Sequence, residues 1–407
     1  MAMRSTADQG KRVEAIPDQG GLLVAYGAAC GEAGLQDQTG TGPTGALRSG
    51  SAQPALTPDE VASVISLAAR APSLHNSQPW KFRPRRDCIE LLADPDRKLT
   101  VVDPAGRELT ISCGAAVFGL RLGLRRVGRL AGAALQPDPA RPLLLARVWP
   151  AGHAARTPAE ADLIAAVPHR HTHRGPFSPG EVPARLLDSL VTDAAAEGCE
   201  LVLITDPQAV GRLGRLVRRA SAEQRANAEI SAELARWVRP FGSEARDGVP
   251  ATARLADAAS TGQAGGLAGE LGQAHPAWVA QTVPCLGPHS AAPRFPERLA
   301  SRDFGLPGTE LAGGEPPLAT AVLMTPGDTP VDWLRAGQAL DRLLLRAAAR
   351  WVFASLQSQP IESPRHRRAV RALVGGQGHP QLLLQFGRAN TTSATARRPQ
   401  AELLVAD

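Results

Sequence analysis

Apolar and polar positions along the chain recur with helical and strand periods, and they predict an ordered series of elements. The first helix begins at residue 57, with Thr57 as N-cap, Pro58 in the first helical position and Glu60 three residues after the cap. Further elements are then expected in this order: strands at 80–83 and 88–93, a turn at 94–96, a helix at 110–127 and a strand at 143–149.

From residue 159 the same order begins again. The second series comprises a helix at 159–167, a polar loop at 170–177, a helix at 182–196, a strand at 200–205, a helix at 208–235, a strand at 319–325, a helix at 332–354 and a strand at 381–387. This repetition predicts an α+β fold made of two tandem, diverged copies, 51–158 and 159–407.

Two segments lack useful periodicity. Residues 1–50 are rich in Gly, Gln, Thr and Ala, and we expect a poorly ordered N-terminal extension. Residues 239–316 carry many Gly and Pro, and so long an irregular segment inside a compact fold is usually functional or disordered. We expect it to be inserted like a lid, with Trp237, Trp278 and Phe304 as candidates to cover a ligand, although ordinary packing also explains each of them.

Composition narrows the class of protein. The chain has 407 residues, of which 43% are hydrophobic and only 4% aromatic, so a large core must be built from Leu, Val and Ala. Five scattered cysteines suggest neither a zinc site nor a disulfide framework, and a reducing cytoplasmic setting fits them. No apolar run approaches the roughly 18 residues of a membrane span, so no membrane partner is expected.

The net charge of +6 could suggest nucleic acid as a partner. The excess arginine, however, is spread over amphipathic helices, as at Arg212, Arg215 and Arg218, which is typical of a solvated basic face. Aromatic residues do not alternate with the basic ones, as a platform for single strands requires. We therefore do not expect a nucleic-acid partner.

The first candidate for chemistry is the loop Pro72-Ser73-Leu74-His75-Asn76-Ser77-Gln78-Pro79-Trp80 between the first helix and the first strand. Pro72 ends the helix, Pro79 keeps Gln78 extended, and Trp80 adds an indole donor. A loop that combines turn residues, two amides and an indole can hold a flat polar ring. The alternative is a solvated turn followed by a core tryptophan.

The second candidate is the basic segment His169-Arg170-His171-Thr172-His173-Arg174. The guanidinium groups of Arg170 and Arg174 and the hydroxyl of Thr172 stand at alternate positions and can converge on one phosphate. Two other interpretations stay open: the three histidines as metal ligands, which the neighbouring arginines disfavour, and a plain solvated loop. The chain shows no nucleophile elbow, Walker loop or Gly-x-Gly-x-x-Gly motif.

These motifs resemble those of flavin-dependent nitroreductases. The 72–80 loop has their pattern of Pro-Ser, two residues, Asn, one residue and Gln-Pro-Trp, and the segments 112–124 and 333–387 are similar to the mycobacterial Acg branch. The resemblance covers most of residues 56–403 and implies the nitroreductase-like FMN-binding fold. Ordinary members are homodimers with FMN at the subunit interface. The resemblance therefore implies that the two copies pair within one chain as a pseudo-dimer, which acts as a monomer or pairs again as a homodimer. Since the second copy has Ala195-Ala196-Glu197-Gly198-Cys199 where the first has its Pro-Ser loop, one complete site is expected.

The resemblance also implies roles for single residues. The residues that match the family's FMN contacts are Pro72, Ser73, Asn76 and Gln78 for the ring and ribityl chain, Arg170, Thr172, Arg174 and Arg397 for the phosphate, and Glu362 and Ser363 for a backbone N–H at flavin N5. Thr172 stands for the usual Ser, and Ser363 for the usual Gly. Trp351-Val352-Phe353 replaces a Gly-Leu pair, so we expect it to crowd the ring.

The implied function is an FMN-dependent oxidoreductase. NAD(P)H or another donor would reduce the flavin, and a nitroaromatic, quinone-like or other acceptor would reoxidise it in a ping-pong cycle. Because the cofactor carries the chemistry, no catalytic side chain and no metal is expected. The alternative is a protein that sequesters or senses FMN without turnover. A basic interaction protein without flavin is disfavoured, because it would not need Asn76, Arg170, Thr172 and Arg174 together.

Overall fold

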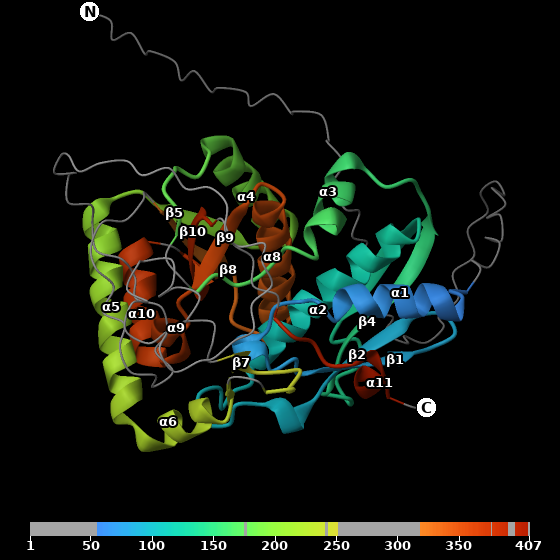
Figure 1. Ribbon diagram of the computed structural model, residues 1–407, viewed down its shortest axis with the longest axis horizontal. Helices are drawn as coiled ribbons and strands as arrows, with labels where there is room; N and C mark the ends of the chain where they lie inside the picture. The colour runs from blue at the N-terminus through green and yellow to red at the C-terminus, as the bar shows by residue number, and fades with distance from the viewer. Residues whose placement is uncertain are drawn as a thin grey trace, which may run out of the picture.

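The computed structural model describes residues 55–174, 177–240, 243–250, 318–375, 377–389 and 395–405. They form an α+β fold around two antiparallel four-stranded sheets, with one two-stranded parallel pair beside them (Figure 1). The predicted extension 1–50 and most of the segment 239–316, including Trp278 and Phe304, lie outside the described residues.

The two large sheets have the same strand order. The first runs β1-β2-β4-β3, and the second runs β5-β8-β10-β9. Their strands are β1 (Trp80–Pro84), β2 (Ile89–Ala93), β3 (Arg129–Leu135), β4 (Leu144–His153), β5 (Glu200–Ile204), β8 (Ala319–Thr325), β9 (Val352–Leu356) and β10 (His379–Arg388), and the small pair is β6 (Val238–Arg239) with β7 (Val249–Pro250). In each sheet a long helix connects the second strand to the edge strand, α2 (Arg107–Arg126) in the first and α8 (Pro330–Ala348) in the second.

Helix starts follow the predicted capping chemistry. In α1 (Pro58–Ala68) the Thr57 hydroxyl accepts a hydrogen bond from the Glu60 amide at 3.2 Å, and the Glu60 carboxylate accepts one from the Thr57 amide at 2.8 Å. The same reciprocal arrangement begins α3 (Pro158–Ala166) and α8. Since each cap satisfies two amides that the helix cannot, these boundaries are encoded locally.

Helices α2 and α8 lie side by side at the centre of the molecule (Figure 1). Their backbones touch at two glycines: a Cβ added to Gly114 would lie 2.3 Å from the Leu334 carbonyl oxygen, and one added to Gly337 would lie 1.9 Å from that of Ile111. Gly114 and Gly337 hold equivalent places, each seven residues after the first residue of its helix. The helices can approach this closely only because neither glycine has a side chain.

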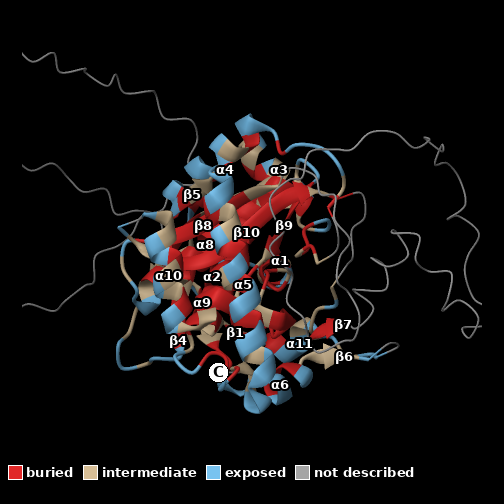
Figure 2. Cartoon of the chain, turned by 90° about the vertical axis from the view of Figure 1, so that its left-hand side faces the viewer, coloured by how far each residue is buried: buried red, intermediate tan, exposed pale blue. Residues whose placement is uncertain are grey.

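Apolar side chains join the helices to the sheets. The first core cluster contains Ile65 of α1, Trp80 and Phe82 of β1 and Leu120 of α2. The second sheet is covered on one face by α8 and α4 (Ala184–Ala196) and on the other by α5 (Pro207–Ala226) and α10 (Pro364–Val374). Its strands β8 and β10 are therefore almost completely buried (Figure 2).

The sequence analysis missed one element and gave the wrong extent for two others. Strand β3 was not predicted. The helix expected at 208–235 is two helices, α5 and α6 (Ala228–Ala235), because Asn227 takes extended backbone angles and its Oδ1 accepts from the Glu229 and Ile230 amides at 2.9 and 3.1 Å. The helix expected at 332–354 ends at Ala348, Trp351 adopts a left-handed φ of 55°, and the apolar residues that follow form β9.

The remaining short elements are η1 (Leu74–Asn76), η2 (Pro95–Arg97), α9 (Gln359–Glu362) and α11 (Gln400–Leu403). None of the helices in the described ranges is both long enough and apolar enough to cross a bilayer.

Candidate functional site

The Pro-Ser loop has an unusual backbone. His75, Asn76 and Gln78 adopt left-handed φ values of 49°, 56° and 49°, so the prediction that Pro79 keeps Gln78 extended was wrong. This conformation costs a residue with a side chain roughly 1 kcal/mol or more. The Ser73 hydroxyl accepts from the Gln78 amide at 3.0 Å, and the Leu74 amide donates to the Ser112 hydroxyl of α2 at 3.2 Å. The loop is thus held in a strained shape and attached to the central helix.

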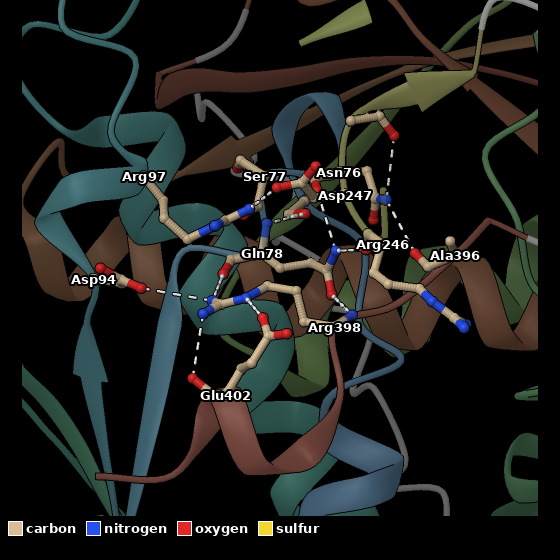
Figure 3. Close-up of polar contacts among 12 residues, drawn as sticks. Asn76, Ser77, Gln78, Asp94, Arg97, Arg246, Asp247, Ala396, Arg398 and Glu402 are labelled. Carbon is tan, nitrogen blue, oxygen red and sulfur yellow. Dashed lines mark hydrogen bonds and ion pairs between the residues drawn. The ribbon is translucent and has the colours of Figure 1, made fainter. Parts of the chain in front are cut away.

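The Asn76 side chain connects this loop to two distant segments. Its Nδ2 donates to the carbonyl oxygens of Gly248 and Ala396 at 3.2 and 3.0 Å (Figure 3). Its Oδ1 accepts from Arg397 Nη1 at 3.0 Å. Asn76 is only 5% exposed, so these bonds are formed away from water. The residue therefore fixes the orientation of Arg397.

Gln78 makes a matching set of contacts. Its Nε2 donates to the Arg246 carbonyl at 2.8 Å, and its Oε1 accepts from the Arg398 amide at 2.8 Å (Figure 3). Arg398 also lies 3.5 Å from the Asp94 carboxylate. The two amides of the loop consequently hold the segments 246–248 and 396–398 against it.

The 246–248 segment is anchored by charge as well. Asp247 pairs with Arg97 and with Arg239, whose Nη2 lies 2.7 Å away. Burial opposes ionisation of Asp247, but hydrogen bonds from Arg239 and Arg97 outweigh it and keep the pKa of this carboxyl below its ordinary value. The guanidinium carbons of Arg239 and Arg97 lie 5.8 and 5.5 Å from the ring centroid of Trp237. Trp237, one of the residues expected to cover a ligand, is thus engaged in cation–π contacts.

Beside the loop lies a group of guanidinium groups that we call the arginine cluster: Arg70, Arg170, Arg174 and Arg397. They come from the end of α1, the segment after α3 and the C-terminal segment. Arg170 Nη2 donates to the Arg70 carbonyl at 3.1 Å, and Arg397 Nη2 donates to the same oxygen at 3.2 Å. Three parts of the chain thus bring positive charge to one place.

Like charges and burial make this cluster unusual. Burial first, and then Arg170 and Arg70, lower the pKa of Arg397 well below its ordinary value. Burial and the nearby Arg170 lower the pKa of Arg174 to about 10. Both effects oppose the charged form, so the cluster is poised to gain from a negative partner.

Asp341 of α8 is the carboxylate in the described residues that faces the cluster. It is 3% exposed, and its Oδ1 lies 4.0 Å from Arg170 Nε. Burial raises the pKa of this carboxyl to about 7, although Arg170 and Arg397 act in the opposite direction. One carboxylate of this kind does not balance four guanidinium groups.

Two buried donor groups of the arginine cluster lack acceptors among the described residues. Arg170 Nη1 and Arg397 Nε are buried and have no hydrogen-bond partner in the parts of the chain that the structure describes. An unmet buried donor normally costs about 1–3 kcal/mol, more for a charged group. A phosphate group fits this arrangement, because it brings three acceptor oxygens and close to two negative charges.

The basic segment leads from the end of α3 to the edge of the second sheet. The Arg170 amide donates to the Ala166 carbonyl at 2.9 Å, so the turn of α3 continues to this residue. Thr172 then forms an isolated parallel bridge with Ala354 of β9, and the His173 amide donates to the Ala354 carbonyl at 2.9 Å.

The three histidines of this segment pack on separate aromatic rings. His169, His171 and His173 lie against Trp351, Phe353 and Phe177, with ring centroids 5.7, 4.3 and 4.5 Å apart. In the described ranges no three His, Cys, Asp or Glu side chains are grouped as a metal site requires. Trp351 and Phe353, expected to crowd a flavin ring, therefore support the back of the basic segment, with Trp351 52% exposed.

The predicted N5 loop lies at the far end of β9. This strand begins beside the basic segment and leads to α9, which contains Glu362, while Ser363 begins α10. The Glu362 carboxylate accepts from Gln224 Nε2 of α5 at 2.7 Å. Gln359, at the start of α9, is 1% exposed, and both polar atoms of its side chain lack a partner in the described residues.

Of the ten residues predicted for the site, the structure groups most in one region. Pro72, Ser73, Asn76 and Gln78 form the loop, while Arg170, Thr172, Arg174 and Arg397 lie beside it, and Glu362 and Ser363 follow β9 away from them. Two members of the site were missed. Arg70 lies two residues before Pro72, and Asp341 is an acid among the apolar residues Leu340, Leu343 and Leu344, a signal that the sequence of α8 does contain.

Fold and site together describe an α+β protein in which arginine side chains from three parts of the chain are grouped beside the Pro-Ser loop. The chain is 31% identical over 357 residues to "Putative NAD(P)H nitroreductase Rv3131" of Mycobacterium tuberculosis, which spans 85% of this chain and 91% of that protein. "Putative NAD(P)H nitroreductase acg" of the same organism is 27% identical over 359 residues, or 86% and 96% of the two chains. "Uncharacterized protein Rv3127", also of that organism, is 28% identical over 352 residues, or 84% and 92%.

No protein-family model matches the sequence. The likeness to Rv3131 nevertheless extends over nearly the full length of both chains. The chain thus belongs to the nitroreductase-like family of mycobacterial proteins that includes Acg, and the resemblance inferred from its motifs is confirmed.

Proposed function

We propose that the chain is an FMN-dependent oxidoreductase of the nitroreductase type. The observation that carries this proposal is the arginine cluster, whose buried, unmatched donors suit a phosphate. The relatives named as NAD(P)H nitroreductases support the choice of FMN as its carrier and of NAD(P)H as electron donor. When bound, FMN supplies the redox chemistry, accepting hydride from a nicotinamide and passing electrons to a nitroaromatic, quinone-like or other acceptor.

The chain's own residues would bind and orient the cofactor. Arg170, Arg174, Thr172 and Arg397 would hold the phosphate, and Pro72 and Ser73 would border the ring and ribityl chain. Asn76 and Gln78 have another task in this proposal, since their amides are engaged by protein groups: Asn76 orients Arg397, and Gln78 holds the 246–248 segment. Glu362 and Ser363 would present backbone amides to the reacting edge of the flavin.

Internal duplication, with repeats at 51–158 and 159–407, is part of the proposal. It is supported by the common strand order and by the equivalent glycines of α2 and α8. A further parallel involves the Pro-Ser loop and its counterpart in the second copy, residues 195–199. The Leu74 amide contacts Ser112, five residues after the start of α2, and a Cβ on Gly198 would lie 3.6 Å from the side chain of Arg335, five residues after the start of α8.

The place equivalent to the Pro-Ser loop is occupied by structural ion pairs. Glu197 is fully buried and accepts from Arg121 at 2.6 Å and from Arg342 at 3.0 Å, and Asp193 accepts from Arg342 at 2.8 Å. Arg121 Nε and Nη2 also lack partners in the described residues, but Glu197 and Asp193 already supply two carboxylates to these two arginines, so an added phosphate would face like charge. We therefore propose one FMN per chain, shared by the two halves.

A second candidate function is sequestration of FMN without turnover. The observation that favours it is the double anchoring of the 246–248 segment over the Pro-Ser loop, by the two amides and by Asp247. Held in this way, the segment would slow exchange of the cofactor and restrict the access of an acceptor.

The visible spectrum of the purified protein tests both candidates. A flavin band that bleaches on anaerobic addition of NADH or NADPH supports the oxidoreductase, and a band that persists with both donors supports sequestration. No flavin band, even after reconstitution with FMN, would refute both.

A further inference from the structure

Asp341 is an unusual neighbour for a phosphate site. It lies in the middle of α8 and is 3% exposed, and among the described residues its one ion pair is with Arg170 Nε, 4.0 Å away. A carboxylate beside a phosphate would normally weaken its binding, because both are anions and compete for the same guanidinium groups. Its position therefore needs an explanation that includes its protonation.

The guanidinium groups around Asp341 donate elsewhere. Arg397 donates through Nη1 to Asn76 Oδ1 at 3.0 Å and through Nη2 to the Arg70 and Ala71 carbonyls at 3.2 Å, while Arg170 Nη2 donates to Arg70 at 3.1 Å. Asp341 thus acts on the cluster by charge rather than through an intimate pair. The donors left over, Arg170 Nη1 and Arg397 Nε, stay available to an incoming anion.

The other charged groups of the described residues that pack around α8 have ion-pair partners of their own. These pairs are Arg121 of α2 with Glu197 at 2.6 Å, Arg342 and Arg346 of α8 with Asp193 of α4 at 2.8 and 2.7 Å, Arg335 with Asp332 of α8 at 3.6 Å, and Arg350 with Asp162 of α3 at 3.0 Å. Within the described ranges, Arg170 and Arg397 are the charged groups that act directly on Asp341, with Arg70 and Arg174 next to them.

We propose, resting on the function proposed above, that Asp341 is the internal counter-anion of the arginine cluster and takes up a proton from solvent when the phosphate of FMN binds. In the free protein the carboxylate offsets part of the buried positive charge. The phosphate, with greater charge and closer contacts, takes over this task. The carboxylate then faces an anion, and its neutral form is favoured.

This exchange makes FMN binding depend on pH in a defined sense. Burial raises the pKa of the free carboxyl to about 7. Above neutrality, the binding of each FMN is therefore accompanied by the uptake of one proton from solvent by Asp341. Binding coupled to one proton weakens by about tenfold per pH unit. The phosphate itself does not mask the effect, because its second ionisation lies near pH 6 and is complete above pH 7.

The test is a titration of flavin binding by fluorescence quenching between pH 6.5 and 8.5, with FMN and with riboflavin, which has the same ring but no phosphate. The proteins compared are the wild type, Asp341→Asn and the control Asp162→Asn, whose exposed carboxylate pairs with Arg350 away from the cluster. Calorimetry of FMN binding to the wild type at pH 8, in two buffers of different ionisation enthalpy, counts the protons taken up and needs no variant.

We expect the wild type and Asp162→Asn to lose close to tenfold in FMN affinity from pH 7.5 to 8.5, and Asp341→Asn to change by less than about twofold and to bind FMN more tightly at pH 8.5. Riboflavin should show no such slope, and proton uptake should approach one per FMN. Equal slopes in wild type and Asp341→Asn, or no proton uptake by the wild type, would overturn the role of Asp341 and leave flavin binding intact. Failure of all three proteins to bind FMN would refute the proposed function, and this inference with it.

Discussion

Replacing Arg170 by alanine tests the phosphate site most directly. Arg170 is 7% exposed and contributes one buried, unmatched donor to the cluster. A hydrogen bond to a charged group contributes about 1.5–3 kcal/mol to binding, which corresponds to a loss of roughly 10- to 150-fold in affinity for FMN. We expect Arg170→Ala to lose FMN affinity within this range at pH 7.

The same change should affect the flavin-free protein little. Burial lowers the pKa of Arg170, with Asp341 acting in the opposite direction, so a charged guanidinium here stabilises the free fold weakly at best. We expect the thermal midpoint of flavin-free Arg170→Ala to lie within about 4 °C of the wild type. Loss of binding and loss of folding can therefore be separated.

Binding is measured by quenching of flavin fluorescence with FMN and riboflavin in parallel. Riboflavin has no phosphate, so its affinity should not change, and the difference between the ligands isolates the coupling between Arg170 and the phosphate. Arg350→Ala is the matched control, because Arg350 is an exposed arginine paired with Asp162. Unchanged FMN affinity in a folded Arg170→Ala protein would refute the phosphate assignment, and an equal loss for riboflavin would show that the effect is not electrostatic.

Three further substitutions test other parts of the structure. Asn76→Ala removes the acceptor that orients Arg397 at 3.0 Å, and we expect about a tenfold weaker FMN affinity with riboflavin affinity less affected; equal losses for both ligands would contradict a positioning role. Gly337→Ala places a Cβ 1.9 Å from the Ile111 carbonyl and should cost about 3 kcal/mol or more in urea unfolding, whereas Gly211→Ala in the open part of α5 should be neutral or stabilising; similar values for the two would refute close contact of α2 and α8. Burial lowers the pKa of His171 to about 4, so its imidazole stays neutral in the folded protein near neutral pH. Stability on the order of 3 kcal/mol is therefore present above pH 6.5 and is lost as the pH falls toward 4. In unfolding experiments at pH 7 and 4.5, His171→Gln should reduce this loss of stability, and an unchanged loss would contradict the prediction.

Local signals made much of the fold predictable. The Thr-Pro-x-acidic starts of α1 and α3 satisfy their own amides within four residues, so they form wherever the chain places them. The alternation of apolar and polar residues in β1, and the short apolar runs of β2 and β8, likewise predicted these strands. Errors arose where a local preference conflicts with distant contacts, as in 352–356, whose apolar residues continue a helical pattern but pair with β10.

The segment proposed to bind phosphate was found from the sequence alone, since Arg170, Thr172 and Arg174 alternate within a few residues. The groups that surround this segment in the fold could not be predicted from the sequence. The Arg70 carbonyl oxygen accepts a hydrogen bond from Arg170, 100 positions later in the chain. Arg397 donates to Asn76, which lies 321 positions earlier. No local pattern could show that the amides of Asn76 and Gln78 are occupied by protein groups.

Capping boxes, apolar periods and short motifs depend on neighbours within a few residues, and for this chain they were enough to predict its class, most helix starts and the segment that supplies two of its arginines. The charge balance of the site depends on which groups are buried together, and burial is a property of the whole fold. Asp341 shows the difference most clearly. In the sequence it is one acid in an apolar helix, and only the packing of α8 against the segments that carry Arg170 and Arg397 raises the pKa of its carboxyl to about 7 and places it beside the arginine cluster.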